Sequence, residues 1–294
     1  MSHAAPRANL WGSAFMVLAM VGFGIEDALF KAATASVSPG IGTILFGVFG
    51  FTGFAALCVR AGDPLWSPHF FSAAMGWRSV FELSGRLFYA LALAFAPLST
   101  TSAILQAAPL VVTLGAAAVL GERVGPRRWI AMGVGFAGVL MILRPFGEGF
   151  SPTLLFAVAG MLGFAGRDLA TRASAPGLSS WQLGTSGFAM VVLAGLLITA
   201  FEATPRLPDP RATLLLLGAG IVGVAAYTAL TRAMRTGEVS VVAPFRYSRL
   251  LVALVLAAIL FGERPGALTL IGATLIVGSG LYTLVRSGRA PKTA

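Results

Sequence analysis

Long apolar segments are the feature of this sequence that most restricts its fold. Charged and proline-rich clusters separate ten such segments, each near the length of about 20 residues that a helix needs to cross a bilayer. They cover residues 10–31, 40–60, 77–96, 98–120, 126–146, 152–174, 179–201, 212–233, 237–261 and 265–286. Only 11% of the residues are charged, whereas soluble domains carry roughly a quarter. The sequence therefore predicts an all-α integral membrane protein with ten transmembrane helices in a lipid bilayer.

Basic residues in the connections predict the orientation of these helices. Alternate connections carry twelve Lys and Arg residues on one face of the membrane and five on the other, and the richer face is expected to be cytoplasmic. Because the number of spans is even, we expect both termini in the cytoplasm and the chain in the inner (plasma) membrane of the cell. The net charge of +10 reflects this bias and does not indicate a nucleic-acid partner, since the bases occur singly or in pairs.

An internal repeat with an offset of 141 residues divides the chain into two halves. The tripeptide Gly-Glu-Arg at 121–123 recurs at 262–264, and the first apolar segment is copied in the sixth. The halves are therefore residues 1–146 and 147–294, with five predicted spans each. Because five is an odd number, the second half enters the membrane upside down. Such an inverted-topology repeat is typical of secondary transporters, which alternate access around a site near the midplane.

Motifs in both halves resemble a known family. Each Gly-Glu-Arg tripeptide closes an apolar helix and precedes a glycine-bearing one, and the segment 242–250 reads VAPFRYSRL. Together they resemble the EamA-like branch of the drug/metabolite transporter (DMT) superfamily, over nearly the whole chain. The resemblance implies a secondary transporter, since members export amino acids and other metabolites or import vitamins such as riboflavin. Glu122 and Glu263, which this topology places on opposite membrane faces, are interpreted as structural elements of the repeat.

The expected function is secondary active transport of a small polar metabolite by alternating access, with export of an amino acid or a related metabolite favoured. Import of a vitamin such as riboflavin is the alternative, followed by a membrane-embedded enzyme or a passive channel. No predicted span contains a histidine and no GxSxG or HExxH motif occurs, so we expect neither an enzyme nor a metal site. We expect no cofactor, and two five-helix halves can enclose a site in a monomer, although a dimer is compatible with the sequence.

Ionisable residues inside the spans are the first candidates for a binding or coupling site, because a charge at the bilayer centre costs about 2.5–3.5 kcal/mol on insertion scales. The primary candidates are Glu26, Asp27, Arg167, Asp168, Arg246, Tyr247 and Arg249, and the secondary ones are Glu82, Arg86, Tyr89 and Gln106. Six bases and four acids lie in the spans or at their ends, and this positive surplus favours zwitterionic or anionic solutes.

Glu26 is the leading candidate, because no residue of opposite charge follows it four positions later, and the same holds for its repeat counterpart Arg167. A carboxyl group in apolar surroundings suits proton coupling or the binding of a substrate amine. Asp27 and Asp168 each precede a base by four residues, so an i,i+4 ion pair explains them as well as a role in a cavity.

Span 9 predicts a second binding element. Arg246 and Arg249 follow the helix-breaking Pro244, and guanidinium groups bind carboxylates through two parallel hydrogen bonds. Tyr247 lies between them and could stack on a flat substrate. Snorkelling of the two arginines to the interface is the alternative.

Overall fold

The computed structural model describes residues 4–119, 121, 124–145, 150–173, 177–236 and 238–287, and in these ranges it contains helices and no strand. The helices of the first half are α1 (Ala4–Ala33), α2 (Pro39–Ala61), the short 3-10 helix η1 (Pro68–Phe71), α3 (Ala73–Phe95), α4 (Leu98–Leu105), α5 (Ala108–Val119) and α6 (Pro126–Leu143). Those of the second half are α7 (Leu154–Ala173), α8 (Ser180–Ala200), α9 (Pro210–Thr236), α10 (Val239–Val242), the 3-10 helix η2 (Ala243–Tyr247), α11 (Ser248–Phe261) and α12 (Ala267–Ser287).

Eight helical segments in the described ranges are long and apolar enough to cross a membrane, which confirms an all-helical, multi-pass membrane protein. The pairs α4–α5 and η2–α11 each count as one of these segments. α12 contributes a shorter apolar stretch, Ala267–Thr283, and α3 has 23 residues but carries several charged side chains. The count of ten spans and their inverted arrangement remain predictions.

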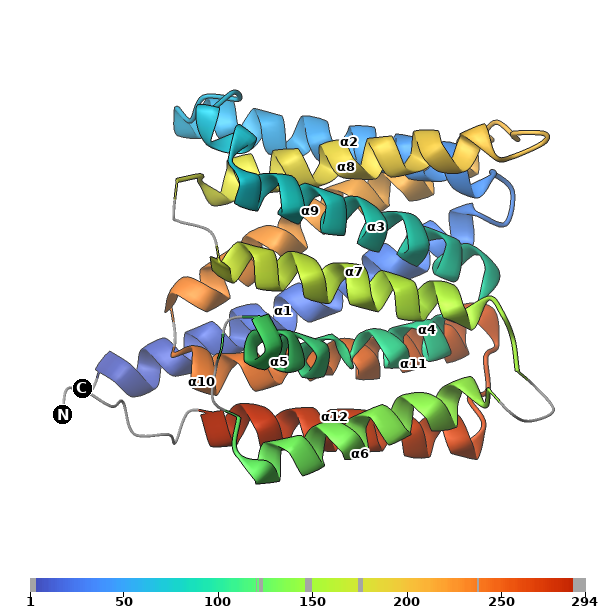
Figure 1. The fold of residues 1–294 in the computed structure, drawn as a ribbon. Helices are drawn as coiled ribbons and strands as arrows, with labels where there is room; N and C mark the ends of the chain where they lie inside the picture. The colour runs from blue at the N-terminus through green and yellow to red at the C-terminus, as the bar shows by residue number, and fades with distance from the viewer. Residues whose placement is uncertain are drawn as a thin grey trace.

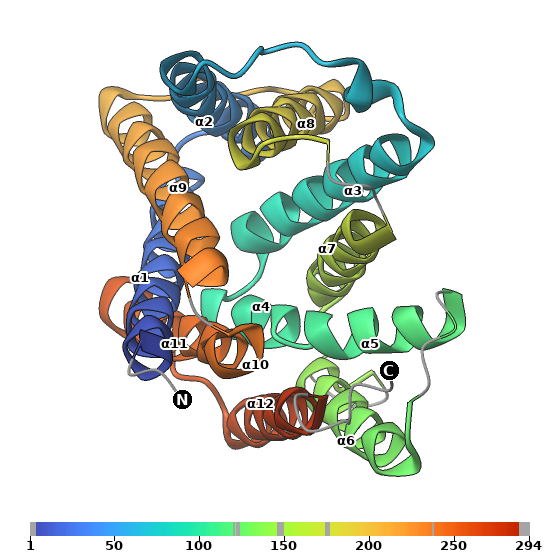
Figure 2. The ribbon, with the colours of Figure 1, turned by 90° about the vertical axis from the view of Figure 1, so that its left-hand side faces the viewer.

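Helices from the two halves pack against each other in pairs. α1 lies along α9, α2 along α8, α3 along α7, and α6 along α12 (Figure 1 and Figure 2). Small residues permit these close approaches: a Cβ added to Gly163 of α7 would meet the backbone of Gly85 on α3. Because each pair joins the two halves, neither half encloses the core alone.

Two predicted spans are interrupted at equivalent positions of the repeat. The first breaks at Gln106 and Ala107, between α4 and α5, just before Pro109. The second passes through η2, which contains Pro244. Proline removes a backbone donor and disturbs the preceding helical turn, which accounts for both interruptions. The breaks touch, because the Gln106 side chain donates a hydrogen bond to the carbonyl of Arg246 at 3.3 Å.

Candidate functional site

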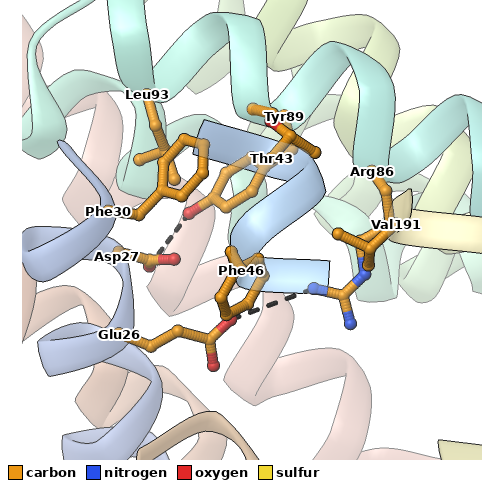
Figure 3. Close-up of a pocket in the computed structure, with 10 residues that line it drawn as sticks. Glu26, Asp27, Phe30, Thr43, Phe46, Arg86, Tyr89, Leu93 and Val191 are labelled. Carbon is orange, nitrogen blue, oxygen red and sulfur yellow. Dashed lines mark hydrogen bonds and ion pairs between the residues drawn. The ribbon is translucent and has the colours of Figure 1, made fainter. Parts of the chain in front are cut away.

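A small cavity, with about 30 Å³ of space for water, lies among α1, α2, α3 and α8 (Figure 3). Its lining residues are Glu26, Asp27 and Phe30 of α1, Thr43 and Phe46 of α2, Arg86, Tyr89, Ala90 and Leu93 of α3, and Val191 of α8. Most of the wall is apolar or aromatic, and a few charged groups converge on it. This combination is typical of sites that bind small molecules.

Glu26 and Arg86 face each other in this cavity. Oε1 of Glu26 lies 3.9 Å from Nη1 of Arg86, which is an ion pair but is too long for a hydrogen bond (Figure 3). Arg86 is held by other groups: its Nε donates to Glu82 at 3.0 Å, and its guanidinium lies 5.5 Å from the ring centres of both Phe164 and Phe188. Among the described residues, the terminal nitrogens of Arg86 donate no hydrogen bond. They can therefore bind a ligand.

Asp27 lies beside Glu26 but has strong partners. Its Oδ2 accepts hydrogen bonds from Arg249 Nη2 at 2.6 Å, Arg249 Nε at 3.2 Å and the Tyr89 hydroxyl at 3.0 Å. The i,i+4 bridge between Asp27 and Lys31 is wrong, because Lys31 instead donates to backbone carbonyls of α3 and its C-cap. Asp27 and Arg249, far apart in sequence, thus form a buried ion pair, and the role of either residue in binding a substrate stays a prediction.

A second charged cluster extends from the cavity toward α7. The Glu82 carboxylate, 2% exposed, lies 3.0 Å from Arg86, 3.4 Å from Arg167 and 3.5 Å from Arg78. Arg167 also pairs with its neighbour Asp168 at 2.8 Å. Glu82 and Arg86 are four residues apart on α3, a spacing at which side chains on a helix meet. For Asp168 the described partner is Arg167, while the side chain of Arg172, its expected partner, lies outside the described residues, as do Glu122 and its surroundings.

The remaining candidates lie away from the cavity wall. Arg246 and Tyr247 belong to η2, and the Tyr247 hydroxyl is directed at Gly280 of α12 with no hydrogen-bond partner among the described residues. Gln106 contacts the Arg246 carbonyl. None of the three is among the residues that line the cavity. Their role in binding a substrate stays a prediction.

Several residues that line the cavity are not among the candidates predicted from the sequence. The side chains in question are Phe30, Thr43, Phe46, Leu93 and Val191. Four are apolar residues within apolar spans, and a lone threonine in such a span most often satisfies its hydroxyl locally, as Thr43 does by donating to the Pro39 carbonyl at 2.7 Å. No sequence signal separates them from residues that face lipid or a neighbouring helix.

The fold is a helical membrane bundle with charged side chains on the wall of a cavity, and comparison with known families identifies its class. The model of the EamA-like transporter family matches residues 10–144 and, a second time, residues 151–285. The chain therefore belongs to the EamA-like transporter family of the DMT superfamily. The predicted family membership is confirmed.

Relatives with assigned names are transporters of different solutes. A riboflavin transporter from Vibrio cholerae is 33% identical over 181 residues, and the match spans 60% of this chain but only 58% of that protein. An S-adenosylmethionine uptake transporter from Rickettsia bellii is 28% identical over 201 residues, 67% of each chain. The pseudopaline exporter CntI from Pseudomonas aeruginosa is 29% identical over 281 residues, 90% of this chain and 93% of the exporter.

A solved crystal structure has the same fold. It superposes with a TM-score of 0.63 at 24% sequence identity and covers 95% of this chain and 98% of its own. Together, the family and the relatives show a membrane transporter. Because the relatives include both an uptake transporter and an exporter, they leave substrate and direction to be inferred from the site.

Proposed function

We propose that the protein is a secondary transporter that exports an amino acid or a related zwitterionic metabolite across the inner (plasma) membrane by alternating access. It crosses the membrane ten times, as two inverted halves of five spans at 1–146 and 147–294, with both termini in the cytoplasm. Adding α3 and α12 to the eight apolar segments supports this count. The start of α1 and the end of α12, which lie on the same side of the bundle in Figure 1, support the even number.

The loose pairing of Glu26 with Arg86 carries the proposal. A zwitterion presents an ammonium group, which suits the Glu26 carboxylate, and a carboxylate group, which suits the terminal nitrogens of Arg86. Since the two protein groups are 3.9 Å apart and share no hydrogen bond, a substrate that separates them replaces one weak contact by two charge-assisted ones. The total charge of the cavity is the same before and after binding. The rings of Phe30, Phe46 and Tyr89 form the surrounding wall for an apolar side chain.

Matched ligands test this charge requirement. Purified protein is screened by thermal shift against amino acids, the amines that lack their carboxylate, and the acids that lack their amino group, because a ligand stabilises the state that it binds. We expect the intact zwitterion to raise the melting temperature and both partial analogues to fail. Each lost charge-assisted hydrogen bond weakens binding by about tenfold or more. Stronger binding of the amine or the acid than of the zwitterion would refute the assignment.

Two substitutions test which side chain binds the amino group of the substrate and which binds its carboxylate. Glu26→Gln is expected to abolish discrimination for the amino group, and Arg86→Gln that for the carboxylate. Glu202→Gln is the matched control, because Glu202 is a carboxylate that accepts from the Gly40 amide at 2.9 Å and is not among the lining residues. Wild-type ligand preference in both Glu26→Gln and Arg86→Gln would show that the substrate binds elsewhere.

Proton coupling is tested separately in reconstituted vesicles. If Glu26 exchanges a proton during the cycle, Glu26→Gln abolishes transport driven by a pH gradient but retains exchange of labelled for unlabelled substrate. An unchanged response to the gradient in this variant would remove Glu26 from the coupling step, while its role in binding the amine is judged by the ligand series.

Import of a vitamin such as riboflavin is the second candidate, and the aromatic wall favours it. Phe30, Phe46 and Tyr89 offer three rings that can contact a flat heterocycle, and one relative is a riboflavin transporter. Riboflavin belongs in the same thermal-shift screen. Stabilisation by riboflavin that survives Arg86→Gln but is lost in Phe46→Ala would favour this candidate over the zwitterion.

A further inference from the structure

The turn between α3 and α4 has backbone groups that the turn itself cannot satisfy. Pro97 lacks an N–H group, so it cannot donate to the carbonyl of Leu93, four residues earlier in the chain. Pro97 is also the N-cap residue of α4, and it offers no side-chain acceptor to the first amides of that helix, those of Leu98 and Ser99. Unpaired backbone groups away from water are costly, so they require partners from elsewhere in the fold.

Lys31, near the end of α1, satisfies the acceptors of this turn. Its Nζ donates to the Leu93 carbonyl at 3.1 Å and to the Ala96 carbonyl at 2.6 Å. The same ammonium lies 5.6 Å from the ring centre of Phe261, at the end of α11. A cation at the C-terminus of α3 also complements the dipole of that helix. Lys31 therefore joins three helices at one end of the bundle.

Glu263, in the connection between α11 and α12, satisfies the donors. Its carboxylate accepts hydrogen bonds from the Leu98 amide at 2.7 Å, the Ser99 amide at 2.9 Å and the Ser99 hydroxyl at 2.6 Å. An acidic group at the N-terminus of α4 again matches the helix dipole. Glu263 comes from the second half of the chain and α4 from the first. These contacts thus join the two halves of the chain.

The turn that both residues bind begins next to the cavity. Leu93 lines the cavity with its side chain while its carbonyl binds Lys31, and Phe30, the residue before Lys31, also lines it. The connections α1–α2, α3–α4, α8–α9 and α11–α12 all lie on the right-hand side of the bundle in Figure 1. Ser38 and Arg206 join two of these connections by hydrogen bonds. Hydrogen bonds between connections from both halves thus hold this end of the bundle together.

We propose that Lys31 and Glu263 form the gate that closes the cavity toward this membrane face, and that release of the start of α4 by Glu263 opens it. This inference rests on the proposed transport function. Movement of the start of α4 away from the α11–α12 connection breaks the contacts of Glu263, because its hydrogen-bond partners are the first residues of α4. When these contacts break, the amides of α4 and the carbonyls bound by Lys31 need water as a replacement partner. The gate therefore opens only toward a hydrated vestibule, because unpaired polar groups away from water are costly.

Thiol accessibility from each face of the membrane measures this gate without a known substrate. The reporter is Thr43→Cys, which lies on the cavity wall, in a Cys58→Ala background. A membrane-impermeant thiol reagent is added to one face of sided vesicles at a time. The exposed Ser36→Cys, in the α1–α2 connection, independently identifies the face at which the Lys31 end lies. An error in the predicted orientation therefore cannot be mistaken for a failure of the gate.

The measured quantity is the labelling rate from the gate face divided by the labelling rate from the opposite face. We expect Glu263→Gln to raise this ratio by about tenfold or more, because a charged acceptor of three hydrogen bonds is lost. Ser99→Ala removes only the hydroxyl contact and is expected to give a smaller rise in the same direction. Glu202→Gln removes a cap on α2 at the same end, without contact to α4, and is expected to label at the parental ratio.

A parental labelling ratio in a monodisperse Glu263→Gln protein would overturn the proposal and reduce Glu263 to a helix cap. If Glu263→Gln does not fold, Ser99→Ala decides by the same criterion. A shift of equal size in Glu202→Gln would also overturn it, since any loosening of this end would then suffice. Because the assay contains no substrate, a failed ligand screen refutes the proposed substrate and leaves the gate result intact.

Discussion

The buried pair of Asp27 and Arg249 allows a quantitative test of how the two halves are held together. Asp27 lies on α1 and Arg249 on α11, and the Asp27 carboxylate is 2% exposed. Arg249→Leu removes hydrogen bonds of 2.6 and 3.2 Å and leaves a buried carboxylate with the Tyr89 hydroxyl alone. Loss of one partner from a buried ion pair typically costs about 3–5 kcal/mol, so we expect the free energy of unfolding to fall by about 3 kcal/mol.

A double-mutant cycle separates the pair from its surroundings. Asp27→Leu combined with Arg249→Leu replaces both charges by apolar groups, and such replacements are often nearly neutral, so we expect the double variant to unfold within about 1 kcal/mol of the parent. The assay is equilibrium unfolding in detergent micelles, followed by circular dichroism. Additive losses in the double variant, or a loss below about 1 kcal/mol in Arg249→Leu, would refute the argument that the two charges stabilise each other.

Three further substitutions test packing and hydrogen bonding by the same unfolding assay. Gly163→Leu must push α7 away from Gly85 on α3, and we expect the free energy of unfolding to fall by about 1–3 kcal/mol. Wild-type stability would contradict the close approach of the two helices. Gly133 lies in helix α6, and a Cβ added there would meet no atom within 4 Å, so we expect Gly133→Ala to raise the free energy of unfolding by about 0.5–1 kcal/mol. A decrease would contradict the open space around Gly133. Tyr89→Phe removes one of the hydrogen bonds to Asp27 and should lower the free energy of unfolding by about 1 kcal/mol. A decrease as large as that of Arg249→Leu would contradict Arg249 as the main partner of Asp27.

Helix content and part of the cavity lining were predictable from the sequence, whereas five of the primary site candidates do not line the cavity: Arg167, Asp168, Arg246, Tyr247 and Arg249. The apolar runs predicted the membrane helices, because the length and hydrophobicity needed to cross a bilayer are properties of a continuous segment. Glu26, Asp27, Arg86 and Tyr89 could be selected because a polar side chain contrasts with its apolar surroundings. All four line the cavity.

Interruptions of the helices were only partly predictable. A proline inside a span, such as Pro244, indicates a place where the helix can bend, but a proline inside a membrane helix is often accommodated without a break. The structure separates α4 from α5 and inserts η2 before α11. Which outcome occurs depends on the neighbouring helix, and here the two interrupted segments contact each other through Gln106.

By itself, the sequence determined the class of protein: an all-helical membrane chain with an internal repeat and a few ionisable residues in apolar spans. Only the tertiary structure decided which charges meet. Local spacing suggested Lys31 as a partner for Asp27, but the partner is Arg249, 222 residues away. Lys31 instead donates to the carbonyl of Leu93, which Pro97 leaves unpaired. Spacing along one helix limits which side chains can be neighbours, whereas the choice among partners depends on how helices from the two halves pack.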